Sequence, residues 1–208
     1  DATDLTDVDL GAGAQTWVLR ADNSDIQIDN ADFAAVDSTY RVNANAKNGS
    51  SVEVGQNGGL DDGNMIFNGV ATANSSITAG TASGNHNIAV TARTGSVASF
   101  TQSSGNAGDV SRVRLAASSD GGITVASTGD HTVNLTARAT NESTIDINTG
   151  DGSDILRVNT SKSDFDINSG NGNDTVAVVA SGNEANASIN TIDIGDGADT
   201  LRLTARAV

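Results

Sequence analysis

The chain carries the stretch INTIDIGDGADTLRLTARAV at residues 189–208, and an earlier stretch, VDLGAGAQTWVLRAD at residues 8–22, runs in step with it. When the two are aligned, Leu201 falls on Trp17 and the next apolar positions also coincide. Self-similarity between distant segments is typical of repeat proteins, in which each unit buries its apolar side chains against its neighbours. The match therefore predicts that both stretches are coils of one repeating structure.

A repeated phrase of the form apolar-x-apolar-Thr-Ala-Arg supports this prediction. Its arginines are Arg93, Arg138 and Arg206, separated by 45 and 68 residues. These intervals correspond to two and three coils of about 22 to 23 residues, which lies within the range of solenoid repeats. The phrase therefore indicates a solenoid period.

A second phrase, apolar-x-apolar followed by a Gly-rich turn, begins at Ile145, Phe165 and Ile192. Weaker copies lie near six earlier positions, namely Val8, Ile26, Val52, Ile77, Val97 and Ile123. Together the copies predict about nine coils. We expect residues 1–144 to form a solenoid with degenerate repeats and residues 145–208 to form regular coils continuous with it.

Within each coil, apolar and polar residues alternate with the period of a β-strand. Ile145 and Ile147, and then Leu156 and Val158, fall on one side. The chain has no Pro, so every coil can donate its backbone N–H groups to a neighbour. We predict an all-β fold, a right-handed parallel β-solenoid (β-helix or β-roll) with no capping helix. A globular β-sandwich is the alternative, because regular short strands suit it too.

Composition limits the width of the core and the classes of partner that the chain can bind. Aromatic residues make up only 3% of the chain, so its side chains can fill only a thin core. The net charge of −15 opposes binding to nucleic acid and to anionic lipid, both of which are recognised by clustered Lys and Arg. Cys is absent, which excludes disulfides and thiolate metal sites. No apolar run is long enough for a membrane span, so we expect no membrane insertion.

Three consecutive turns carry glycines and aspartates in a fixed pattern: TGDGSDILR from Thr149, SGNGNDTVA from Ser169 and IGDGADTLR from Ile194. They resemble the glycine-rich nonapeptides of the repeats-in-toxin (RTX) calcium β-roll. The resemblance implies that Asp154, Asp174 and Asp199 are Ca²⁺ ligands, with Asp151, Asn171 and Asp196 as weaker candidates. It also implies that the turn glycines shape the site: Gly150, Gly152, Gly170, Gly172, Gly195 and Gly197.

Calcium prefers six to eight oxygen ligands, more than one turn supplies. We therefore expect ions between turns of successive coils, completed by backbone carbonyls. The alternative is an ion-free structural turn, because Gly and Asp are turn residues for local reasons. The loop at residues 55–64 contains Asp61 and Asp62, and either another ion site or a solvated loop fits it.

A catalytic function has little support in the sequence. His86 and His131 lie beside polar turns, where we expect surface histidines. No G-x-S-x-G elbow or other nucleophile–base phrase is present. We therefore expect a protein that is not an enzyme.

The arginines of the Thr-Ala-Arg phrase are expected to stack on one flank of the solenoid. One interpretation is a solvated face that pairs with nearby Asp. The other is a basic strip that docks an acidic flank of a neighbouring molecule. Both remain open at the level of sequence.

Together these features predict a secreted, extracellular or cell-surface structural protein stabilised by Ca²⁺. We expect a homo-oligomer or filament formed by head-to-tail stacking of coils, as in a fibre, surface layer or adhesin stalk, because the first and last coils resemble each other. A cell-surface polysaccharide is a further candidate partner. The alternative is a non-catalytic, RTX-like calcium-folding module of a larger type I-secreted enzyme or toxin.

Overall fold

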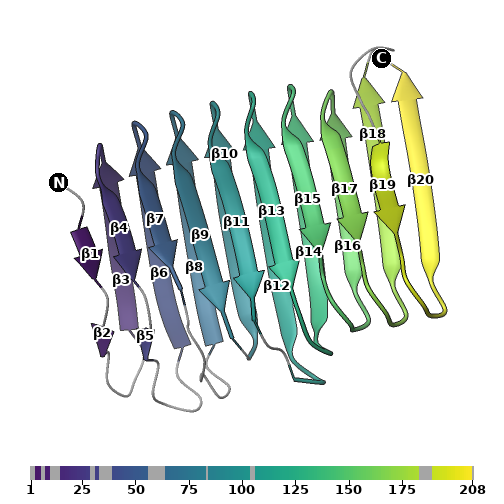
Figure 1. Ribbon diagram of the computed structural model, residues 1–208, viewed down its shortest axis with the longest axis horizontal. Helices are drawn as coiled ribbons and strands as arrows, with labels where there is room; N and C mark the ends of the chain where they lie inside the picture. The colour runs from purple at the N-terminus through teal and green to yellow at the C-terminus, as the bar shows by residue number, and fades with distance from the viewer. Residues whose placement is uncertain are drawn as a thin grey trace.

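The computed structural model consists of β-strands stacked along one axis, with β1 and β20 at opposite ends of the stack (Figure 1). It describes residues 3–5, 8–9, 15–28, 31–32, 39–55, 64–82, 84–103, 106–182 and 189–207. Within these ranges the chain forms strands and turns but no helix. Accordingly, none of the described residues belongs to a helix that is long and apolar enough to cross a membrane.

Two nine-stranded sheets, here called sheet A and sheet C, account for most of the structure. Sheet A contains β1 (Thr3–Leu5), β4 (Asp25–Ile28), β7 (Ser51–Val54), β9 (Ser76–Thr81), β11 (Val97–Gln102), β13 (Gly122–Ser127), β15 (Thr144–Asn148), β17 (Asp164–Asn168) and β19 (Ile189–Asp193). Sheet C contains β3 (Gln15–Asp22), β6 (Thr39–Lys47), β8 (Asn64–Thr72), β10 (His86–Arg93), β12 (Val110–Ser118), β14 (Thr132–Thr140), β16 (Ile155–Ser161), β18 (Thr175–Gly182) and β20 (Thr200–Ala207). A small two-stranded sheet pairs β2 (Val8–Asp9) with β5 (Ala31–Asp32).

The chain alternates between the two large sheets, so each coil contributes one strand to sheet A and one to sheet C. Neighbouring strands pair in parallel, as β15 does with β17 and β16 with β18. A β-sandwich would pair antiparallel strands through hairpins. The parallel β-solenoid predicted from the repeats is therefore confirmed, and the sandwich alternative is wrong.

The alignment of the first and last repeats is also confirmed by the register. Leu201 and Trp17 occupy the same row of sheet C. The residues between them in that row are all apolar: Val176, Leu156, Leu135, Val113, Ile88, Phe67 and Val42. One inward row thus runs through every coil, as a stacked core requires.

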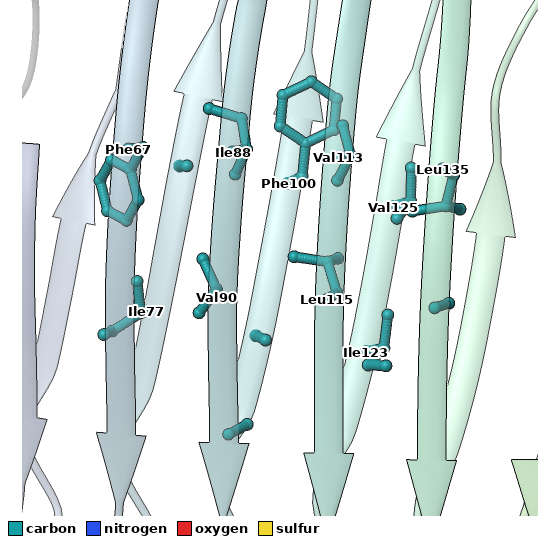
Figure 2. Close-up of a cluster of buried hydrophobic side chains, with 14 of the residues drawn as sticks. Phe67, Ile77, Ile88, Val90, Phe100, Val113, Leu115, Ile123, Val125 and Leu135 are labelled. Atoms are coloured by element: carbon teal, nitrogen blue, oxygen red, sulfur yellow. The ribbon is translucent and has the colours of Figure 1, made fainter. Parts of the chain in front are cut away.

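The core is the thin space between the two sheets. Phe67 and Ile88 of sheet C face Ile77 and Phe100 of sheet A across it (Figure 2). Burial alternates strictly along strands such as β6 and β12, because successive side chains point to opposite faces of a sheet. The outward residues of both sheets therefore remain available to solvent or to partners.

The connections from sheet C back to sheet A are short, and several share a serine at one position, which Gly121 occupies between β12 and β13. Ser24, Ser50 and Ser75 each donate a backbone N–H to the Oγ of the serine in the following coil, over 3.2 Å, the last acceptor being Ser96. The residues before these serines include non-glycine residues with positive φ, such as Asn48 at 57°, a conformation that Asn tolerates. This ladder closes one edge of the solenoid and leaves the opposite edge to the Gly-Asp turns.

Candidate functional site

The Gly-Asp turns connect sheet A to sheet C in the last three coils. Asp154, Asp174 and Asp199 each directly precede a strand of sheet C, so the parallel register stacks them in one column. The backbone N–H of Asp154 donates to Oδ1 of Asp174 over 2.8 Å, and that of Asp174 donates to Oδ1 of Asp199 over 2.9 Å. The structure therefore brings together the three residues that the RTX resemblance singled out.

Two of these carboxylates are buried inside the turn edge. Asp154 and Asp174 are each 1% exposed. Oδ1 of Asp154 accepts a hydrogen bond from the backbone N–H of Val133 at 2.7 Å. Oδ2 of Asp154 and Oδ2 of Asp174 are buried without a hydrogen-bond partner. Each turn thus presents one buried carboxylate oxygen that makes no hydrogen bond of ordinary geometry, although the side chain of Thr149 or Ser169 lies near the carboxylate. Buried polar atoms left in this way call for a specific explanation, such as an ion.

Burial changes the acidity of both groups. Desolvation raises the pKa of Asp154 to about 7; hydrogen bonding from the Thr149 side chain and the Val133 N–H opposes this, and the negative charge of Asp174 adds to it. Desolvation likewise raises the pKa of Asp174; hydrogen bonding from the Asp154 N–H and the Ser169 side chain opposes this, and the charge of Asp199 adds to it. Ionised, the column would place like charges in a poorly solvated space, which is costly unless a cation compensates.

The glycines allow the turns to stack at close range. A Cβ built on Gly170 would lie 1.8 Å from the carbonyl oxygen of Gly150, and one on Gly172 would lie 1.7 Å from that of Gly152. Gly195 and Gly197 meet the glycine carbonyls of the preceding coil in the same way. Only glycine permits this approach, so the two glycine columns hold the turns in register.

The third position of the turn faces outward. Asp151 and Asn171 are exposed, and Nδ2 of Asn171 donates to Oδ1 of Asp151 over 2.8 Å. Asp196 is exposed too, and its backbone carbonyl accepts the N–H of Gly172 at 2.9 Å. The structure thus separates the weaker ligand candidates from the buried Asp column.

The donor chemistry of the column fits a hard cation such as Ca²⁺, because its unshared atoms are carboxylate oxygens. Asp154 and Asp174 would hold the ion, and Asp199 continues the column. Among the described residues no group of three or more acidic, His or Cys side chains is close enough to hold a metal ion by itself. Backbone carbonyls or water would therefore complete the shell.

The Asp column is the C-terminal end of a longer row of buried residues, of which the sequence pattern predicted only the aspartates. Towards the N-terminus the same register contains Val133, Ser111, His86, Met65 and Tyr40, all buried. The N–H of Met65 donates to Nδ1 of His86 over 3.3 Å. This contact repeats the N–H-to-side-chain pattern of the Asp column.

The prediction that both histidines lie on the surface is wrong. His86 is 2% exposed and His131 is fully buried. Nε2 of His131 lies 2.9 Å from Oγ of Ser127, and burial lowers the pKa of this imidazole. One sequence signal was available for His86, because it occupies the position of the aspartate in its turn. Polar neighbours in the sequence did not show that the side chains of His86 and His131 are buried.

The register also corrects the arrangement of the Thr-Ala-Arg arginines. Arg93 pairs with Ser118, which pairs with Thr140, and Arg206 leads back to that same row. Arg138 instead pairs with Ala116, two positions earlier in the strand. All three are exposed on the outer face of sheet C. The three arginines therefore share one flank, as expected, but they do not lie in a single row.

The loop aspartates Asp61 and Asp62 lie outside the described residues.

No family model matches this chain, and no curated protein or solved structure is significantly similar to it. The functional conclusion therefore rests on the geometry of the described residues, above all the Asp column.

Proposed function

We propose that this protein is a secreted structural subunit that Ca²⁺ stabilises and that self-associates by stacking coil on coil. The observation that supports it is the pair of buried Oδ2 atoms at Asp154 and Asp174. An ionised carboxylate in that position needs a counter-charge, and Ca²⁺ supplies one together with a preference for oxygen. Binding to the folded state alone would shift the equilibrium towards folding.

Calcium-dependent folding would suit an exported protein. At low calcium the chain of net charge −15 would be less stable, because self-repulsion opposes compaction. At the millimolar calcium found outside cells, extracellular modules commonly bind the ion. Stability would then be gained after export, at a cell exterior such as a fibre, surface layer or adhesin stalk.

The coil of β19 and β20 supports the stacking part of the proposal. Leu201 and Leu203 are 42% and 52% exposed, whereas Val176 and Val178 of the preceding strand, in the same rows, are 1% and 2% exposed. Among the described strands, β20 lies at the edge of sheet C, and an exposed inward row of this kind gains free energy when another coil covers it. We propose that β20 of one copy stacks against β3 of a second copy, where Trp17 and Leu19 occupy the matching rows.

Sedimentation velocity of the chain in chelator and in millimolar Ca²⁺ tests both parts. We expect a slow species in chelator and large, fast species with Ca²⁺. At about 500 mM salt, where contacts between charged faces are screened, the double variant Leu201→Asp/Leu203→Asp should fold with Ca²⁺ but stay small, whereas the control Val97→Asp, an exposed apolar site on sheet A, should assemble. An identical compact monomer under both conditions would contradict the proposal, and a monomer that becomes compact only with Ca²⁺ would favour the alternative, a calcium-folding module of a larger secreted enzyme or toxin.

A further inference from the structure

The two faces of the solenoid carry opposite charge. The strands of sheet C contain ten of the chain's eleven Lys and Arg residues and one acidic residue, Asp22. The ten are all exposed: Arg20, Arg41, Lys47, Arg93, Arg112, Arg114, Arg138, Arg157, Arg202 and Arg206. This basic face belongs to a chain whose net charge is −15.

Sheet A shows the reverse pattern. Its strands contain seven acidic residues and no Lys or Arg. Four of the acids fall in three consecutive strands, β15, β17 and β19, and all four are exposed: Asp146, Asp164, Asp166 and Asp193. A shallow groove of about 320 Å³ crosses this patch, lined by Asp146, Asp166 and Asp193 together with Asn148, Asn168 and Thr191.

Arg114 and Arg138, near the middle of sheet C, have no acidic neighbour in the adjoining strands. Outward neighbours of Arg114 in the adjoining strands are Ala89 and Thr136, and those of Arg138 are Ala116 and Asn159. Oδ1 of Asp22, the one acid in these strands, already accepts a hydrogen bond from Nδ2 of Asn48 at 2.7 Å. Like charges arranged in this way repel one another unless an anionic surface covers them.

We propose that the outer face of sheet C docks the acidic outer face of sheet A of a second copy. The basic strands β12, β14 and β16 are consecutive coils that carry Arg112, Arg114, Arg138 and Arg157. The acidic strands β15, β17 and β19 are also three consecutive coils. Both patches repeat at the strand spacing of about 4.8 Å, so charges on one surface can match those on the other along several coils.

The acidic face of sheet A offers hydrogen-bond acceptors for the guanidinium groups. Arg presents a planar fork of donors that suits carboxylate oxygens, and the groove between Asp146 and Asp166 offers such oxygens at the surface. Because the two docking faces differ, the contact is heterologous and leaves one free face on each copy, so it can repeat sideways. It is lateral, and independent of the coil-on-coil stacking proposed above.

Charge reversal tests the contact. One variant carries Arg112→Glu, Arg114→Glu and Arg138→Glu, and the other carries Asp146→Lys, Asp164→Lys and Asp166→Lys. Both include Leu201→Asp and Leu203→Asp, which removes stacking as a cause of assembly. The matched control changes three exposed turn acids, Asp120→Lys, Asp130→Lys and Glu142→Lys, and so alters net charge as the acidic-face variant does. Circular dichroism verifies that each protein is folded in millimolar Ca²⁺.

Sedimentation velocity at about 20 mM and 500 mM salt, where screening differs strongly, gives the readout. The stacking-deficient parent and the turn control should associate at low salt and dissociate at high salt. Each face variant should lose at least ten-fold in association constant, and an equimolar mixture of the two should recover it through the swapped charges. Absence of rescue, or equal losses in the turn control, would overturn the docking. A stacking-deficient parent that stays monomeric at low salt would also overturn the docking. If its Arg face then binds polygalacturonate, that face would be assigned to an anionic polysaccharide.

Discussion

Oδ1 of Asp174 lies 2.8 Å from the backbone nitrogen of Asp154, whereas Oδ2 of the same carboxylate has no hydrogen-bond partner. One oxygen thus joins adjacent coils and the other is unshared. These two tasks can be separated by substitution, because Asn keeps the first and changes the second.

Asp174→Ala should destabilise the apo protein more than Asp174→Asn. The Ala variant leaves the buried N–H of Asp154 without its acceptor, at a cost of about 1–3 kcal/mol, whereas Asn retains Oδ1. Both variants should lose most of the stability gained on adding Ca²⁺. Urea unfolding with chelator and with Ca²⁺ measures this, and the exposed Asp130→Asn is the control. A full calcium increment in Asp174→Asn would remove Asp174 from the ligand set.

In chelator, the stability of the protein should fall as pH rises from about 4 to about 7. The pKa of Asp154 is about 7 in the folded state against 3.8 ordinarily, so the folded state binds more protons in this window and stability declines with pH. The loss approaches about 4 kcal/mol. Ca²⁺ binds the ionised carboxylate and should oppose the decline.

Asp154→Asn isolates this effect, because it removes the titration and keeps the side-chain size. The burial-lowered pKa of His131 acts with the opposite sign but is common to both proteins. The difference between the two pH profiles, measured by urea unfolding, should therefore report Asp154. Parallel profiles would show that the Asp154 carboxyl does not titrate in this range.

Gly172→Ala should disrupt the turn edge. Its Cβ would lie 1.7 Å from the Gly152 carbonyl oxygen, so neighbouring coils would have to separate. Gly49→Ala is the matched control, because Gly49 also has positive φ but no atom lies within 4 Å of its built Cβ. We expect Gly49→Ala to cost about 1 kcal/mol and Gly172→Ala several times more, by thermal unfolding in Ca²⁺. Equal losses would show that backbone conformation alone decides both sites.

Phe100→Ala should cost about 3–5 kcal/mol, because it leaves a cavity between the sheets. Phe100 is fully buried in β11, whereas Val97 of the same strand is exposed. Val97→Ala should change stability by less than about 0.5 kcal/mol. Denaturant unfolding compares the two, and a similar loss for both would contradict the thin-core description.

Much of the fold was accessible from the sequence because its rules are local. Strand alternation depends on neighbouring residues, and the repeated phrases mark equivalent coils. The alignment of Leu201 with Trp17 therefore predicted a true row of the sheet. The stacking of Asp154, Asp174 and Asp199 on successive coils was likewise accessible, because the Gly-x-Gly-x-Asp pattern repeats at the same place in each coil; their role as Ca²⁺ ligands stays a prediction.

The sequence by itself determined the solenoid, its inward apolar rows and the Asp positions. The tertiary structure alone decided which residues share a row, since the side chain–backbone contacts that link adjacent Asp turns span 20 residues in one coil and 25 in the next. Such variation moved Arg138 out of the row of Arg93 and placed His86 in the column of Asp154. The separation of charge between sheets A and C was also not evident from the sequence. Charge on a face is a sum over coils, and that sum requires the register.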